Sequence, residues 1–137
     1  MPSTNLQLEQ LKTLYDYTKF HIGLYGTLLA GFMGVSGFAA GHLSRTSLLG
    51  LKLATFLLLI AAMAGGVVAS SIVDVYQNYG LWKEDAGLEK FWTTAIGPFN
   101  GKWMFAKTWW RIEHTAFWIA VLIVVGGFLL KGIADIR

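Results

Sequence analysis

The feature that most constrains this chain is a set of three long segments without a charged side chain. Residues 20–44, 53–73 and 114–130 contain no Asp, Glu, Lys or Arg. A bilayer core of about 30 Å needs roughly 20 apolar residues to cross it as a helix. Strands are excluded for such segments, because the open edge of a sheet cannot face lipid. We therefore expect an all-α integral membrane protein with three transmembrane helices, over residues 20–41, 48–73 and 112–131.

The composition agrees with a membrane domain and excludes several other classes of protein. The 137 residues fit one domain, 1–137, of which 55% are hydrophobic and only 14% charged, whereas soluble domains are about 25% charged. The absence of cysteine excludes disulfides, thiolate nucleophiles and cysteine-type metal sites. The net charge of +3 is spread thinly, without the basic cluster of a nucleic-acid binder. The expected partner is the lipid bilayer, and no nucleic acid is expected.

The residues before the first apolar segment predict an amphipathic helix over 4–19. Thr4 and Gln7 fit a capping box, which satisfies the first free N–H groups of a helix. Leu8, Leu11 and Tyr15 recur at helical spacing, with charged residues elsewhere on the wheel. Such a helix either lies in the headgroup region and continues into the first span or docks onto the long loop. The pattern does not separate these two arrangements.

The connection between the second and third spans, residues 74–111, is unusually aromatic. It holds ten of the twenty aromatic residues of the chain: Tyr76, Tyr79, Trp82, Phe91, Trp92, Phe99, Trp103, Phe105, Trp109 and Trp110. Disordered segments are poor in aromatic residues. The loop is therefore expected to be ordered, lying at the membrane interface or capping the bundle, and to be the functional surface of the protein.

The distribution of basic residues predicts an orientation. Three spans place the N-terminus and the loop on one side, with seven Lys and Arg at positions 12, 19, 83, 90, 102, 107 and 111. The other side has four, at positions 45, 52, 131 and 137. Basic residues are enriched in cytoplasmic segments. The N-terminus and the loop are expected in the cytoplasm, in a multi-pass protein of a prokaryotic inner membrane.

Small residues recur along one side of the first span at spacings of three and four. This seam consists of Gly23, Thr27, Ala30, Gly34, Gly37 and Gly41. Helices associate in lipid by close backbone approach, which small side chains permit. The seam is expected to pack either against another span of the same chain, the more routine use, or against a second copy or another membrane protein.

The stretch TWWRIEHTAFW, residues 108–118, combines three tryptophans with ionisable residues at the start of the third span. The first and third spans run parallel, so polar residues at their ends should meet at one rim: Lys19, His21, Asp74, Arg111, Glu113 and His114. A structural belt is the first interpretation, with Glu113 paired to Lys19 or Arg111 and without a cofactor or metal. The second is haem b held by His21 and His114. The third, a carboxylate–histidine metal site, is disfavoured because adjacent helical side chains such as those of Glu113 and His114 diverge by about 100°.

No phosphate loop, nucleophile elbow or dinucleotide fingerprint is present, and no catalytic residue is predicted. The spans also lack the central ionisable residue that coupled transporters usually need. We expect a non-enzymatic membrane protein that forms a homo-oligomer, of pore type, or is a subunit of a larger membrane complex. In a pore, the polar lining would come from Thr27, Ser36, Thr55, Ser70 and Ser71. The alternative is a haem b-binding electron-transfer subunit.

Overall fold

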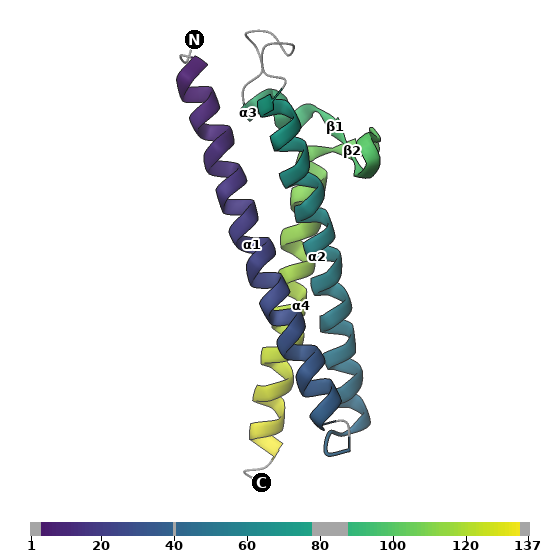
Figure 1. Ribbon diagram of the computed structural model, residues 1–137. Helices are drawn as coiled ribbons and strands as arrows, with labels where there is room; N and C mark the ends of the chain where they lie inside the picture. The colour runs from purple at the N-terminus through teal and green to yellow at the C-terminus, as the bar shows by residue number, and fades with distance from the viewer. Residues whose placement is uncertain (1–3, 40, 78–87, 135–137) are drawn as a thin grey trace.

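The computed structural model describes residues 4–39, 41–77 and 88–134, which form three long helices lying side by side (Figure 1). These are α1 (Thr4–Ala39), α2 (Arg45–Gln77) and α4 (Ala106–Ala134). Each runs antiparallel to the next, so the N-terminus and the α2–α4 connection lie at one end of the bundle, and the α1–α2 link and the C-terminus at the other. Helix α2 packs closely against both of the others.

Helix α1 joins two segments that the sequence predicts separately. The amphipathic helix 4–19 and the span 20–41 form one unbroken helix of 36 residues, which at 1.5 Å per residue is about 54 Å long. Residues 4–19 therefore continue the direction of the span instead of lying flat beside it. Leu11 is completely buried, in a cluster with Ile72 of α2 and Phe91 of the connection. The N-terminal part of α1 thus docks onto the end of α2 and onto the α2–α4 connection.

Helices α2 and α4 are longer than the sequence indicates. Ser44 caps α2, because its Oγ accepts a hydrogen bond from the backbone N–H of Ser47 at 3.1 Å. The helix then extends beyond both ends of the predicted 48–73. Helix α4 begins directly after a short strand at Ala106, before the predicted start at 112.

The described part of the α2–α4 connection contains a small hairpin that the sequence analysis did not predict. After α3 (Leu88–Thr93), strands β1 (Ala95–Ile96) and β2 (Met104–Phe105) pair antiparallel around the short 3-10 helix η2 (Pro98–Asn100). The indole of Trp109 donates a hydrogen bond to the carbonyl of Ile96 at 3.0 Å. Tyr79 and Trp82 of the predicted aromatic loop lie outside the described residues, as does the side chain of Tyr76.

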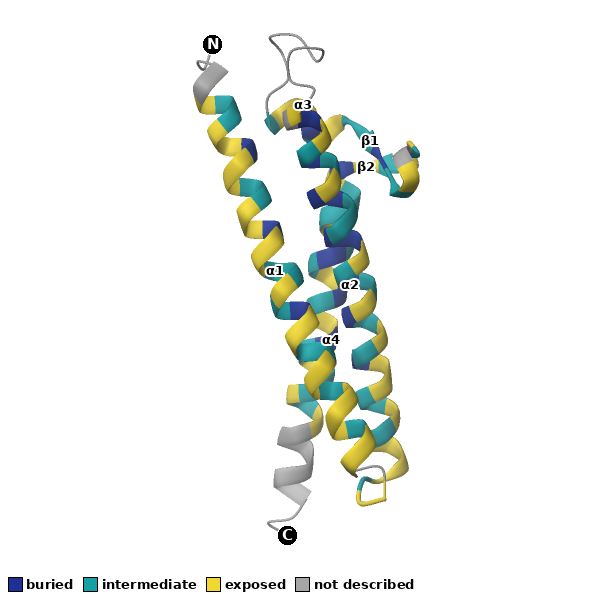
Figure 2. Ribbon diagram, in the orientation of Figure 1, coloured by how far each residue is buried: buried dark blue, intermediate teal, exposed yellow. Residues whose placement is uncertain are grey.

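The buried apolar residues form two clusters along the bundle (Figure 2). The first lies at the N-terminal end, where α1, α2, α3 and the hairpin meet: Leu11, Val68, Ile72, Val75, Phe91, Ile96 and Ala106. The second lies further along the three helices: Tyr25, Ala54, Leu58, Ala61, Ala116 and Ala120. Four of its six members are alanines, whose small side chains allow helix backbones to approach closely.

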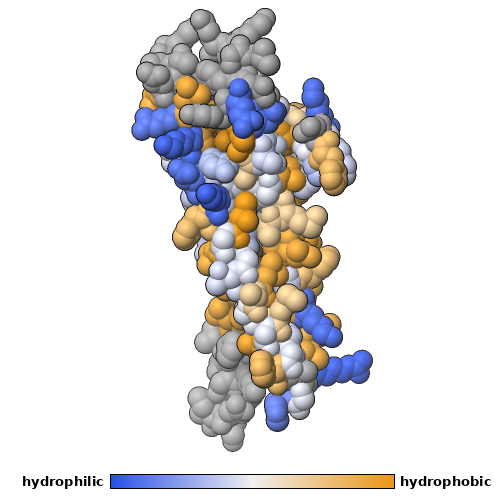
Figure 3. All heavy atoms as spheres, viewed as in Figure 1, coloured by the Kyte–Doolittle hydropathy of each residue, from blue (hydrophilic) through white to orange (hydrophobic). Residues whose placement is uncertain are grey.

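Two helices are long and apolar enough to cross a membrane, α2 over Arg45–Val75 and α4 over Ala106–Gly127. In the expected first span, residues 20–39 of α1 are also free of charge but rich in glycine, which lowers their hydropathy. Large apolar side chains are exposed along this part of all three helices. On the face shown in Figure 3, hydrophobic and near-neutral residues cover the middle of the bundle, and hydrophilic residues lie towards its two ends. The belt consists of Phe20, Met33, Val35, Phe38, Leu49, Leu53, Phe56, Leu59, Met63, Trp118, Ile119, Leu122 and Val125. So large an apolar surface is typical of contact with lipid or another protein.

Candidate functional site

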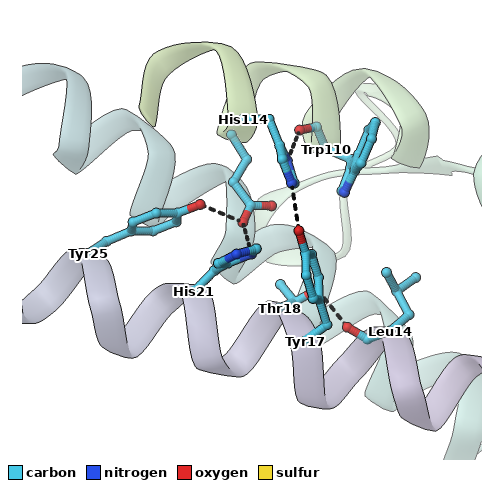
Figure 4. Close-up of polar contacts among 8 residues, drawn as sticks. Leu14, Tyr17, Thr18, His21, Tyr25, Trp110 and His114 are labelled. Atoms are coloured by element: carbon cyan, nitrogen blue, oxygen red, sulfur yellow. Dashed lines mark hydrogen bonds and ion pairs between the residues drawn. The ribbon is translucent and has the colours of Figure 1, made fainter. Parts of the chain in front are cut away.

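A polar cluster lies between the two apolar clusters, where α1 and α4 face each other (Figure 4). Tyr17, His21 and Tyr25 project from one face of α1, because residues four apart share a helix face. Glu113 and His114 reach them from α4. Few backbone contacts join α1 to α4, so these long side chains are what connects the two helices here.

Glu113 is the centre of the cluster. Its side chain is only 1% exposed, and its Oε1 accepts a hydrogen bond of 3.1 Å from the hydroxyl of Tyr25. The His21 Nδ1 lies 3.8 Å from the same oxygen, which is an ion-pair distance when the imidazole is protonated but too long for a good hydrogen bond. The second carboxyl oxygen, Oε2, and the His21 Nδ1 are buried without a hydrogen-bond partner among the described residues. The carboxyl group is thus only partly satisfied, which is unusual for a buried polar group.

A glycine of α2 makes room for this carboxyl group. A Cβ atom at Gly65 would lie 3.3 Å from Glu113 Cδ, from Glu113 Oε1 and from Ile22 Cγ1. Such contacts are tighter than those of most side chains, so any residue larger than glycine would press on both α1 and α4. Gly65 is therefore the residue of α2 that packs directly against the Glu113 carboxyl group.

His114 has both ring nitrogens in polar contacts. Nδ1 lies 2.9 Å from the carbonyl oxygen of Trp110, and Nε2 lies 3.3 Å from the hydroxyl of Tyr17. A carbonyl oxygen only accepts hydrogen bonds, so Nδ1 carries the proton, and in the neutral imidazole Nε2 accepts from Tyr17. The indole of Trp110 packs on the His114 ring at a centroid distance of 4.3 Å. These contacts fix the orientation of the imidazole.

Of the predicted rim cluster, the structure brings together His21, Glu113 and His114. The rings of His21 and His114 are 5.6 Å apart between centroids and nearly perpendicular. Lys19 and Arg111 are exposed, and neither pairs with Glu113, so that expected pairing is wrong. The reason is geometric: both basic side chains extend to the surface, whereas the carboxyl group points into the bundle.

Asp74 also lies apart from this group. It is exposed on α2, where it lines a separate cavity of about 510 Å³ with Ser70, Ser71 and Lys102. Sequence reasoning missed the two tyrosines of the site, Tyr17 and Tyr25. Their only signal was their place four residues before and four residues after His21, on the same face of the helix.

The geometry does not fit the haem alternative. Ligation by His114 through Nε2 would break its contact with Tyr17, and the His21 and His114 rings are in direct edge-to-face contact, where a haem held by both would have to lie. A second cavity, of about 210 Å³, is apolar and lined by residues such as Leu28, Phe32 and Leu58. Neither cavity is lined by His21 or His114. Within the described ranges, no three His, Cys, Asp or Glu side chains are grouped as metal ligands would be.

The small-residue seam lies on the outside of the chain. Every seam residue is exposed, and a Cβ atom at Gly23, Gly34, Gly37 or Gly41 would meet nothing within 4 Å. The inward face of α1 is formed instead by residues such as Tyr25, Leu28 and Phe32. Ala30 is two positions from both Leu28 and Phe32, about 200° around the helix. Packing of the seam against another span of the same chain, the more routine expectation, is therefore wrong.

Comparison of the chain with protein-family models, with curated proteins and with solved structures found no match.

Proposed function

We propose that the chain is a non-enzymatic, multi-pass membrane protein that acts as an assembly unit, using the outward seam of α1 to bind a helix of another subunit. The occupant that we favour is a second copy of the chain, which would make the functional form a homo-oligomer. The membrane that we propose is a prokaryotic inner membrane. The N-terminus would be in the cytoplasm, because the sequence assigns seven of the eleven basic residues to the segments on that side of three spans. The alternative is that the same surface binds a different subunit of a larger membrane complex.

This proposal includes α1 as a third transmembrane helix. Its charge-free residues 20–39 lie beside α2 and α4. They contribute Phe20, Met33 and Phe38 to the exposed apolar belt. Twenty residues of helix extend for about 30 Å, the thickness of a bilayer core. Lys19 at one end and Arg45 beyond the other would then lie in the two headgroup layers.

The single observation that carries the proposal is the exposure of all six seam residues. In lipid, a helix gains little from covering apolar surface, so association depends on close packing of backbones. A stripe of glycine, alanine and threonine allows this close packing, and it has that effect only where another helix lies against it. Since α2 packs on the opposite face of α1, and the side chains of α1 that reach α4 lie on that face too, the missing helix would come from another chain.

The same structure gives less support to a conducting pore. The hydroxyl groups of Thr27, Thr55, Ser70 and Ser71 all donate to carbonyl groups one turn earlier in their own helices. Such hydroxyls are already satisfied and need no aqueous lining. The proposed assembly is therefore one of packed helices, and conduction is not part of it.

The test is the mass of the detergent-solubilised protein with Gly34→Leu, measured by native mass spectrometry. A Cβ atom at this exposed position would meet nothing within 4 Å, so we expect the helices to insert and fold while the assembly dissociates to single chains. Gly127→Leu on α4 is the matched control. Gly127 is also exposed, and a Cβ atom there would meet nothing within 4 Å, but it lies on a different helix from the seam, so the oligomer should persist.

Two results would contradict the proposal. One is a wild-type protein that has the mass of a single chain, with no other subunit bound. The other is an assembly unchanged by both Gly34→Leu and Gly37→Leu, which would show that the seam is not the contact surface.

A further inference from the structure

The hairpin of residues 95–105 is apolar on both of its faces. Ile96 is buried against the cluster at the N-terminal end of the bundle, and its partner Met104 lies on the same face, since directly opposite residues in an antiparallel pair point the same way. Trp103 and Phe105 alternate with Met104 and so share the outer face. Their side chains are 65% and 58% exposed, and Phe99 at the tip is completely exposed.

The backbone holds these aromatic side chains outward. Phe99 has φ 56° and ψ 38°, a left-handed conformation that is uncommon for any residue other than glycine and is costly for a bulky one. The indole of Trp103 lies directly on two glycines: a Cβ at Gly97 would be 3.0 Å from its Cγ, and a Cβ at Gly101 would overlap it. This strained backbone leaves the Phe99 side chain without buried apolar surface in the chain, which is consistent with a contact outside it.

The position of the hairpin identifies that contact. The hairpin projects sideways from the bundle, not along its axis (Figure 1), so in a membrane-embedded bundle it extends over the bilayer. Phe105 directly precedes Ala106, the first residue of α4, and Ala106 lies seven residues, or about 10 Å of helix, before Glu113. The outward apolar belt of α4 starts shortly after Glu113, at Trp118. Lys107 and Arg111 are exposed on α4 between the hairpin and the apolar belt. Such cations interact favourably with a headgroup layer that contains anionic lipids.

From this geometry we infer that Phe99, Trp103 and Phe105 form a lateral anchor that inserts into the headgroup layer of the bilayer in which the protein is embedded. Aromatic side chains with a neighbouring lysine, here Lys102, have the composition of membrane-interface segments. The anchor would fix the depth and tilt of α4, which begins directly after β2. This inference rests on the membrane placement of the bundle but not on the seam of α1.

The absence of cysteine allows a clean test with single spin labels. The full chain is reconstituted in vesicles of phosphatidylcholine and phosphatidylglycerol, with a label at Phe99→Cys, Glu89→Cys or Leu122→Cys. Collision rates with oxygen, which concentrates in lipid, and with a water-soluble nickel complex are then measured. Glu89 is exposed on α3 and serves as the aqueous control, and Leu122 is exposed in the belt and serves as the lipid control.

We expect the label at position 99 to collide more with oxygen and several-fold less with nickel than the label at position 89. A label at Lys102→Cys, which leaves all three aromatic residues in place, should show the same preference. Nickel access at position 99 equal to that at position 89 would overturn the inference, as would low access to both reagents, which indicates cover by protein. Failure of the Leu122 control would instead overturn the membrane placement itself.

Discussion

At the scale of single residues, the unusual feature is a buried carboxyl group with one donor. Glu113 is almost fully enclosed, yet within the described residues its only hydrogen bond comes from the Tyr25 hydroxyl. Burial of a polar group without a partner costs free energy, and for an isolated ionised group the cost is large. The Tyr25–Glu113 contact is therefore the interaction on which the stability of the site depends most.

Tyr25→Phe should lower the free energy of unfolding by about 1–3 kcal/mol, the usual cost of leaving a buried polar group without its partner. Tyr17→Phe is the matched control. It removes an equivalent hydroxyl from the same helix face, but Tyr17 is 46% exposed and water can replace its contact with His114. Thermal unfolding in detergent, followed by circular dichroism, measures both.

A second variant tests whether the effect acts through Glu113. Glu113→Gln alone should be only modestly destabilising, because the amide oxygen can still accept from Tyr25. In the Tyr25→Phe background the same change should cost less than it does alone, since a neutral amide is cheaper to leave unpaired than a carboxylate. Equal losses for Tyr17→Phe and Tyr25→Phe, with additive behaviour of the double variant, would refute this account.

Part of the site was predictable from the sequence. Parallel first and third helices predict His21 and His114 at similar depth, and their rings do lie 5.6 Å apart. The partner of Glu113 was not predictable, because the sequence offers charged candidates at the rim while a phenol gives no charge signal. The direction in which the carboxyl group points depends on packing, and Gly65 comes into contact with it only once α2 is in place.

At the scale of elements, the boundaries depend on contacts between helices. Nothing at residue 19 breaks a helix, so α1 continues through the change from polar to apolar sequence. The charge-free segments predict the spans, but α2 and α4 extend further. At the end of the bundle that holds α3 and the hairpin, their additional turns are packed into the apolar cluster through Val75, Ala106 and Trp109. The hairpin was missed because two-residue strands have no periodicity, and Gly97-Pro98 and Gly101 signal only a turn.

The close approach of α2 to the site predicts different tolerances at two adjacent glycines. Gly65→Ala would place a methyl group 3.3 Å from Glu113 and from Ile22, and overpacking of this kind typically costs about 1–3 kcal/mol. Gly66→Ala has no neighbour within 4 Å and should be neutral or slightly stabilising, because alanine favours the helix.

Thermal unfolding of the two single variants in the same detergent makes the comparison. If Gly65→Ala were as stable as Gly66→Ala, α2 could not be packed against the Glu113 carboxyl group as described. Loss of stability in both would indicate a general intolerance of α2 to alanine, unrelated to the site.

At the scale of the whole molecule, the bundle has two parts. One is the mainly apolar part of the three long helices, and the other is the end where the first part of α1 and the last turns of α2 meet α3 and the hairpin. The Glu113 cluster lies where these two parts meet. The N-terminus and the hairpin share one end, and the α1–α2 link shares the other with the C-terminus (Figure 1). If all three long helices cross the membrane, the two ends must lie on opposite sides of it.

The orientation of the molecule gives the last prediction. If the chain has three spans, the sequence assigns seven Lys and Arg to the segments on the side of the N-terminus and four to those on the other, and segments rich in basic residues stay in the cytoplasm. In bacterial cells we expect alkaline phosphatase fused after Arg137 to be active, since it folds only outside the cytoplasm, and a fluorescent protein fused there by the same export route to be dark. Phosphatase fused to a chain truncated after Gln77, the last residue of α2, should be inactive, because this end of α2 lies on the side of the N-terminus. The reverse pattern would invert the orientation, and equal reporter activity at both positions would show that α4 does not cross the membrane.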